Sequence, residues 1–285
     1  MTSDDGYNAI EETAFRARYK SSFAADSRLG YYIVAAAIVL LIYGLWHLGF
    51  SFTKFFYGLL SLGNFVVLMF PPSWVDTPTL IRFMKALGET VAIAFLGTMI
   101  AALIALPLSF IAANNTTVSQ ILRFFARRSF DTLRGVDILV WALIWVNVVG
   151  LGPFAGVLAI AISDIGSFGK LFSEAIEASD KRPVEGVMAA GGSRLHTIRF
   201  GILPQVAPVL ISQVLYYFES NTRSATIIGI VGAGGIGLQL SEQIRTLEWQ
   251  TVCFLIIMIL LTVSVIDMVS TRLRTAIAGN ASTTI

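Results

Sequence analysis

The stretch PVEGVMAAGGSRLHTIRFGILPQVAP, residues 183–208, is a patterned polar segment with apolar segments on both sides. Its distinguishing residues are Gly191 and Gly192, then the basic residues Arg194, His196 and Arg199, and finally Leu203 and Pro204. Such a pattern is typical of a docking element rather than of a passive loop. What docks there depends on the nature of the flanking apolar segments.

The composition identifies those segments as membrane spans. Hydrophobic residues make up 55% of the 285 residues, charged residues only 13%, and the mean hydropathy is +0.75. A soluble domain carries about 25% charged residues. Several segments reach the roughly 20 apolar residues that a bilayer-spanning helix needs. The sequence therefore predicts an all-α integral membrane protein.

The sequence lacks the residues that several classes of function require. Cys253 is the single cysteine and lies in an apolar run, so no intrachain disulfide or thiolate metal site is expected. His47 and His196 are too few for a metal or catalytic cluster. The net charge of +2 is not clustered enough for nucleic acid. No GxxxxGK[ST] motif is present, so we expect no cofactor and no ATP hydrolysis by this chain.

Six spans follow from the apolar runs. They are residues 29–50, 86–113, 136–150, 154–172, 201–231 and 249–269. Residues 52–70 are apolar but interrupted by Gly58, Gly63 and Asn64, so an interfacial or partly re-entrant helix is expected, with a seventh span as the alternative. The connection 114–134 is expected to be a cytoplasmic loop whose arginines line a surface helix. Residues 1–28 and 273–285 are interpreted as polar tails, and residues 1–28 do not resemble a secretory signal.

Lysines and arginines set the orientation, because cytoplasmic loops carry an excess of them. With the N-terminus inside, fourteen fall on the cytoplasmic side: Arg16, Arg18, Lys20, Arg28, Arg123, Arg127, Arg128, Arg134, Lys181, Arg182, Arg194, Arg199, Arg272 and Arg274. Four fall outside: Lys54, Arg82, Lys85 and Arg245. We therefore expect both termini, and the stretch 183–208, in the cytoplasm.

The spacing within this cytoplasmic stretch resembles the EAA loop of ABC importer permeases. Glu185, Gly191 and Leu203-Pro204 fall in the register of that motif, while Gly186 and Val187 replace its two alanines. Longer segments resemble the permease subunit of phosphonate-type ABC importers: MFPPSW (69–74), ETVAIAFLGT (89–98), ALPLSFIAANN (105–115), LVWALIWV (139–146), GLGPFAGVLA (150–159), GKLFSEAIE (169–177), residues 183–208, and NTRSATIIGIVGAGGIG (221–237).

This resemblance implies a type I ABC importer permease domain at residues 29–272 in the bacterial inner membrane. It implies a homodimer lining one path, two separate ATP-binding cassette subunits that bind ATP and Mg, and an extracytoplasmic phosphonate-binding protein. Import would proceed by alternating access. Phosphonate is the expected cargo, with phosphite, phosphate or an organophosphate ester as alternatives. A distant alternative is an ion-coupled secondary transporter, although no internal repeat is visible.

The resemblance also assigns residues 183–200 to ATPase coupling. Val187, Ala190 and Leu195 can offer an apolar contact in a helix-in-groove mode. The other residues expected to contribute are Glu185, Gly186, Ala189, Gly191, Arg194, Arg199 and Pro204. The alternative is an ordinary amphipathic cytoplasmic loop.

The fifth and fourth spans carry the candidate substrate path. Its residues are Glu219, Ser220, Asn221, Arg223, Ser224, Ser163 and Asp164. A charge at membrane depth costs about 2.5–3.5 kcal/mol, so it should be paired or face a wet cavity. Glu219 and Arg223 are four residues apart and can pair, and a guanidinium suits an oxyanion. Asp164 is expected to pair with Arg223 or Lys170. The alternative is that these ion pairs only hold the spans together.

Two further motifs remain. GAGGIG at 232–237 satisfies GxGxxG, but it follows a membrane span instead of a strand, so dinucleotide binding is rejected. We expect Gly232, Gly234, Gly235 and Gly237 to form flexible or closely packed backbone at an outer gate. Arg123, Arg127 and Arg128 are interpreted as a positive-inside determinant, with contact to anionic lipid or to the ATPase as the alternative.

Overall fold

The computed structural model describes residues 30–73 and 75–282. The chain separates into two units, Met1–Val67 and Leu68–Ile285, and each is considered by itself. The predicted tail 1–28 and the last residues of the tail 273–285 lie outside the described residues.

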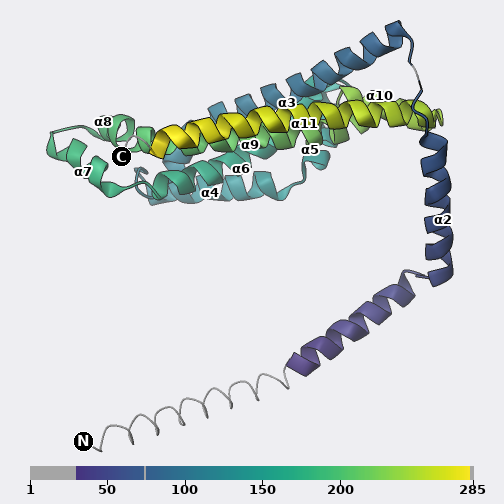
Figure 1. The fold of residues 1–285 in the computed structure, drawn as a ribbon. Coiled ribbons are helices and arrows are strands. Elements are labelled where there is room, and N and C mark those ends of the chain that lie inside the picture. Colours follow the sequence, from purple (N-terminus) through teal and green to yellow (C-terminus); the bar gives the residue numbers. More distant parts are fainter. Residues whose placement is uncertain (1–29, 74, 283–285) are drawn as a thin grey trace, which may run out of the picture. The chain divides into compact units, whose positions relative to one another are not determined.

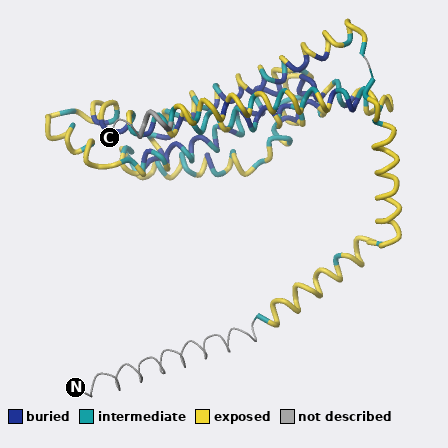
Figure 2. Tube along the Cα trace, in the orientation of Figure 1, coloured by how far each residue is buried: buried dark blue, intermediate teal, exposed yellow. Residues whose placement is uncertain are grey.

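The first unit contains the helix Gly30–His47 and nearly all of α2 (Phe52–Met69). Neither helix has a buried residue, and most of the trace is exposed in Figure 2. Each has 18 residues and so is about 27 Å long, close to the thickness of the hydrocarbon core. Both have the length and composition to cross a membrane. The interfacial placement of 52–70 therefore stays a prediction.

The second unit is an all-helical bundle (Figure 1). Its long helices are α3 (Thr77–Ala112), α4 (Gln120–Gly135), α6 (Pro153–Glu177), α9 (Leu203–Ile230) and α11 (Trp249–Ser282). Its shorter elements are α5 (Ile138–Val149), α7 (Lys181–Ala189), α8 (Arg194–His196), a π-helix (Thr197–Ile202) and α10 (Ile236–Arg245). The long helices lie lengthwise beside one another, with α7 and α8 at one end and α10 at the other. α11 stays helical through most of the segment we interpret as a polar tail.

Helix α6 is the centre of this bundle, because it packs against α3, α4, α5 and α9. Ile160 lies in the core near one end of α6, and Phe168 and Phe172 lie in the core towards the other. Glycines allow the close approaches that membrane helices use for packing. Gly97 of α3 faces Ile160, and Gly169 of α6 faces the ring of Phe130 of α4.

The third predicted span differs in the structure. α5 has only 12 residues and is about 18 Å long, too short to cross alone. It follows α4 after a bend of 87°, so the pair forms at most one broken span. In the described part of the chain, six helices have the length and composition to cross a membrane, the number that was predicted. Phe52–Met69 is among them, and 136–150 is not. Most of the connection 114–134 is helix α4.

Candidate transport path and coupling element

Helix α9 carries two charged residues, Glu219 and Arg223, and they form an ion cluster with a third residue, Arg274 of α11. Nη2 of Arg223 lies 3.3 Å from Oε1 of Glu219, so the predicted i, i+4 pair forms. Nη2 of Arg274, from α11, lies 2.9 Å from Oε2 of the same carboxylate. The Glu219 side chain is 8% exposed, whereas that of Arg223 is 50% exposed. Two guanidinium groups therefore neutralise one buried carboxylate, and the guanidinium of Arg223 remains half-exposed.

Arg274 was missed as a partner because the predicted span ended at residue 269. Only a longer α11 brings its side chain back to Glu219. The register of the two helices is fixed nearby by the Ser270 hydroxyl, which donates to the Leu215 carbonyl at 3.1 Å. The Arg274 guanidinium also lies over the Tyr216 ring, 5.8 Å from its centroid.

Within the second unit, the face of α9 that carries Arg223 is largely uncovered. Tyr216, Ser220, Arg223 and Ile227 recur at helical spacing on that face. Tyr216 is 51% exposed and Ile227 is 57% exposed, while Ser220 is half-buried. A membrane helix with a half-exposed arginine faces water or protein rather than lipid. The arrangement therefore provides one wall of a polar path or of an interface.

The other polar residues of these spans point into the bundle. The Asn221 side-chain amide donates to the Thr98 hydroxyl at 2.8 Å and to an Asp164 carboxylate oxygen at 2.5 Å. All three side chains are buried, and they come from α9, α3 and α6. Such a satisfied network ties three helices together. A place for Asn221 and Asp164 on the transport path stays a prediction, as it does for the half-buried Ser163 and Ser224.

The expected ionic partners of Asp164 were wrong. Among the described residues, its side-chain contact is with Asn221, and neither Arg223 nor Lys170 pairs with it. Arg223 lies on the opposite, exposed side of α9. Nζ of Lys170 lies 4.0 Å from a carboxylate oxygen of Asp131 on α4. Sequence spacing placed these charges at similar depth but could not give the rotation of each helix.

The glycine segment 232–237 is closely packed rather than flexible. All six residues are buried. Gly232, Gly234 and Gly235 have φ of 100°, 84° and 72°, a region that suits glycine. The Gly232 carbonyl accepts from the Gly152 amide at 3.0 Å, and the Thr90 hydroxyl accepts from the Ile236 amide at 2.8 Å. The segment therefore joins α9 to α10 while packing on α3 and α6. Its role as an outer gate stays a prediction.

We expect Gly237→Ala to destabilise the fold. A Cβ at this position would overlap the carbonyl oxygen of Thr226, and backbone cannot move aside as a side chain can. Overpacking of this kind costs about 1–3 kcal/mol. The measurement is the midpoint of thermal unfolding in detergent. Gly88→Ala is the matched control, since a Cβ at Gly88 of α3 meets nothing within 4 Å. Equal midpoints for the two variants would contradict the packing account.

The predicted coupling stretch forms two short helices that leave apolar side chains exposed. Asp180 caps α7 by accepting from the Arg182 amide at 3.1 Å, and Ser193 caps α8 by accepting from the His196 amide. Leu195 is 77% exposed. Met188, which the sequence analysis did not include, is 53% exposed. The remaining exposed members are Glu185, Gly186, Ala189, Ala190, Gly191, Arg194, Arg199 and Pro204.

Val187 was expected to offer an open apolar contact, but it is half-buried. It packs against Gly192, where an added Cβ would overlap it. It packs within the element instead of offering an open surface. Gly201 of the π-helix lies against Val184 of α7. Val184 in turn packs on the core cluster that includes Ile202 and Val206.

The family follows from comparison with known proteins. A family model described as the binding-protein-dependent transport system inner membrane component matches residues 105–280, more than half of the chain. The chain belongs to this family. It is therefore a multi-pass inner-membrane permease and not itself an enzyme, and ATP is bound by a separate ATPase. This confirms the predicted resemblance to ABC importer permeases.

Several relatives of the permease are named for phosphite or phosphonate transport. A putative phosphite transport system permease protein HtxC of Stutzerimonas stutzeri is 43% identical over 224 residues, covering 79% of this chain and 78% of the relative. The phosphite transport system permease protein PtxC of the same organism is 35% identical over 248 residues, covering 87% and 88%. A putative cryptic phosphonate transport system permease protein PhnE2 of Escherichia coli K12 is 53% identical over 117 residues, covering 41% and 96%.

Solved structures agree on the fold of the permease. A chain from an inward-facing MetNI methionine ABC transporter matches with a TM-score of 0.62 at 17% identity, covering 71% of this chain and 99% of that one. A chain of an amino acid ABC transporter matches with a TM-score of 0.53 at 18% identity, covering 70% and 100%. The expected ABC importer permease fold is thus confirmed.

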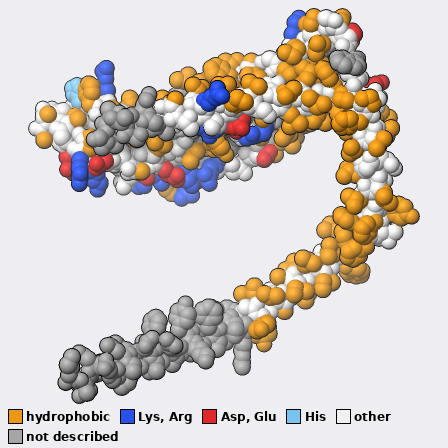
Figure 3. Space-filling view, in the orientation of Figure 1, with side chains coloured by type: hydrophobic (Ala, Val, Ile, Leu, Met, Phe, Trp, Pro, Cys, Tyr) orange, Lys and Arg blue, Asp and Glu red, His pale blue; other side chains and the backbone are white. Residues whose placement is uncertain are grey.

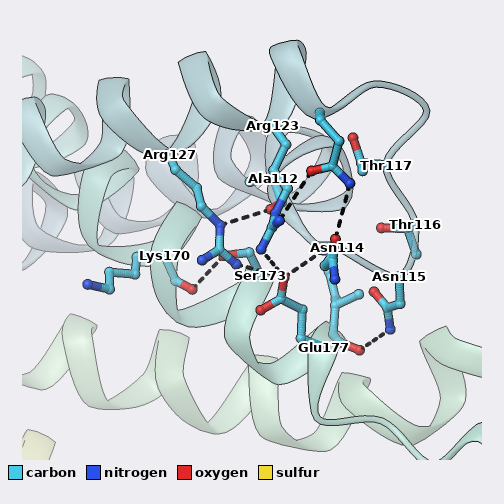
Figure 4. Close-up of polar contacts among 12 residues, drawn as sticks. Ala112, Asn114, Asn115, Thr116, Thr117, Arg123, Arg127, Lys170, Ser173 and Glu177 are labelled. Carbon is cyan, nitrogen blue, oxygen red and sulfur yellow. Dashed lines mark hydrogen bonds and ion pairs between the residues drawn. The ribbon is translucent and has the colours of Figure 1, made fainter.

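In the permease, the end of α6 is anchored just before the coupling element (Figure 4). Glu177 is the last residue of α6, and its Oε1 lies 2.7 Å from Nη2 of Arg127 and 3.5 Å from Nη2 of Arg123. The backbone amide of Asn114 donates to the same oxygen at 2.6 Å. Nε of Arg127 donates to the Ala112 carbonyl at 3.1 Å. Arg123 and Arg127 therefore join α4 to the ends of α3 and α6, a contact that the sequence analysis did not foresee.

Proposed function

We propose that the chain is the membrane-spanning subunit of an ATP-driven importer of phosphorus oxyanions, with phosphite or phosphonate as cargo. The observation that carries this proposal is Arg223, a half-exposed guanidinium on a membrane span of a chain whose relatives are named for phosphite and phosphonate. Guanidinium forks match the paired oxygens of phosphite and phosphonate groups. The other groups on that face, Tyr216 and Ser220, add hydroxyls.

A second copy of the chain completes the path in this proposal. The uncovered face of α9 needs a partner other than lipid, and a twofold dimer would place the same polar face on both sides of one path. Two ATP-binding cassette subunits would dock on α7 and α8, where Leu195 and Met188 are exposed. A binding protein outside the membrane would deliver the cargo.

The cargo assignment is broader than the sequence-based expectation of phosphonate. Two relatives named for phosphite transport are 43% and 35% identical to this chain, and a relative named for cryptic phosphonate transport is 53% identical over 117 residues. Both anions present oxygens bonded to phosphorus, which is the group that Arg223 can bind. Phosphate and organophosphate esters share that group and are the alternatives to be tested.

The cargo is tested with the complete complex of permease, ATPase and binding protein in proteoliposomes. We expect ATP-dependent uptake of phosphite or methylphosphonate, with weaker uptake of phosphate. The same assay without the ATPase should show none. If the complete complex transports neither phosphite nor phosphonate, the cargo assignment is wrong. Transport by the permease alone would favour an ion-coupled carrier instead.

We also propose that both termini are cytoplasmic. The second unit has four long candidate spans and the bent pair α4–α5, so its two ends lie on opposite sides if all five cross. The C-terminus and the N-terminus then share a side only if one of Gly30–His47 and α2 crosses. The distribution of lysine and arginine supports this arrangement.

A cysteine placed between those two helices tests this orientation. In a Cys253→Ser background, we expect Ser51→Cys to react with a membrane-impermeant maleimide added outside intact spheroplasts. That result places the connection outside, which is expected if Gly30–His47 crosses and requires that α2 does not cross. A cysteine at Val118, in the connection between α3 and α4, is the control and should react only after permeabilisation. Protection of Ser51→Cys from outside would indicate that α2 also spans.

A further inference from the structure

We propose that the permease binds the phosphate headgroup of an anionic phospholipid in a pocket between α4 and α6. This headgroup pocket has a volume of about 240 Å³. Its lining residues are Arg127, Arg128, Phe130, Asp131, Lys170 and Ser173. A drug-sized ligand site measures about 300–1,000 Å³, so this space suits a headgroup rather than a whole lipid.

The charges around the headgroup pocket favour an anion. Arg128 is 67% exposed and Lys170 is 38% exposed, and both lie beside one carboxylate, that of Asp131, at 3.2 and 4.0 Å. Arg127 contacts Glu177 through Nη2. Each guanidinium has five N–H donors, so these carboxylates leave donors free for a phosphate. Figure 3 shows Lys and Arg side chains gathered on the side of the bundle where α4 lies.

The depth of the headgroup pocket matches the edge of the bilayer. Ser173 lies 20 positions after Pro153, the first residue of α6. At 1.5 Å per residue this is about 30 Å, the thickness of the hydrocarbon core. Lys170 lies one turn closer to the centre, and its long side chain can reach the interface. The cations therefore stand at the level of lipid phosphates.

Apolar side chains beside the headgroup pocket favour a lipid over a free anion. Ile121, Phe124 and Phe125 of α4 are 69%, 57% and 63% exposed. The Arg128 guanidinium lies 5.6 Å from the centroid of the Phe124 ring. A helix with exposed aromatic residues next to basic ones is typical of the membrane interface. A free phosphate would use the cations but would leave this apolar surface without a partner.

The experiment is native mass spectrometry of the purified complex, titrated with phosphatidylglycerol or phosphatidylcholine. We expect phosphatidylglycerol to be retained preferentially by the wild-type chain. The double variant R128Q/K170Q should bind it about thirtyfold more weakly, since each cation near the membrane surface contributes about 1 kcal/mol. The matched control R82Q/K85Q removes two exposed cations near the start of α3 and should keep the lipid.

Three outcomes would overturn the proposal. They are equal retention of both lipids, full retention by R128Q/K170Q, and displacement of the lipid by millimolar inorganic phosphate, which would indicate a free-anion site. The variant R128K/K170R keeps both charges and should retain phosphatidylglycerol. If R128Q/K170Q is misfolded, this charge-preserving variant and the lipid competition still decide the question.

Discussion

Replacing Arg223 by alanine is expected to reduce ATP-dependent uptake at least about a hundredfold, because two charge-assisted hydrogen bonds of about 1.5–3 kcal/mol each would be lost. The complex should still assemble. Arg274 lies 2.9 Å from Glu219 and continues to neutralise that buried carboxylate when Arg223 is absent. The measurement is uptake of phosphite and methylphosphonate by the complete complex in proteoliposomes, with assembly followed by size-exclusion chromatography.

Two further variants separate binding from charge. Arg223→Lys keeps the positive charge but loses the planar fork, so its uptake should fall between wild type and alanine. Arg245→Ala removes an exposed arginine at the end of α10 and should transport normally. Unimpaired uptake by Arg223→Ala would remove this residue from the path and leave it a structural partner of Glu219.

The local features of this site could be predicted from sequence. Glu219 and Arg223 are one helical turn apart, so their pairing needs no knowledge of the fold. The stretch 183–200 could likewise be singled out from its polar pattern between apolar runs and its EAA-like spacing, and it contains the short helices α7 and α8. Periodicity and composition report on such features because their causes lie within a few residues.

Features that depend on helix rotation and register could not be predicted. Arg274 reaches Glu219 only because α11 continues past residue 269 and is aligned with α9 at Ser270. Asp164 turns towards Asn221 because α6 is the central helix and buries that face. The contact of Arg127 with Glu177 joins residues 50 positions apart. Each of these pairings is decided by packing rather than by spacing.

The bend between α4 and α5 shows how composition misleads. Residues 136–150 are apolar and read as a span, yet α5 is only 12 residues long. The arginines of 114–134 indicated a connection outside the membrane, but α4 packs its Phe130 against Gly169 of α6. An amphipathic helix with one buried aromatic has too few apolar residues to be recognised as part of a span.

Replacing Leu195 by glutamate is expected to abolish coupling to the ATPase. Leu195 is 77% exposed on α8, and Met188 is 53% exposed on α7, so both are available to fill a groove on a partner. A charge buried without a partner in such a contact costs about 3 kcal/mol or more, which corresponds to at least a hundredfold weaker docking. The measurements are co-purification of the ATPase and the uptake supported per ATP hydrolysed.

The matched control is Val118→Glu, which introduces the same charge at an apolar side chain that is 83% exposed. Val118 lies in the connection between α3 and α4, and neighbouring residues Asn115 and Thr116 share a cavity with Lys181 of α7. Both changes therefore fall at the same end of the bundle, but only Leu195 belongs to the proposed docking helices. Loss of ATPase binding in the Leu195 variant alone would identify α8 as the contact. Equal loss in both would indicate a broad electrostatic effect, and normal coupling in the Leu195 variant would exclude this side chain from the interface.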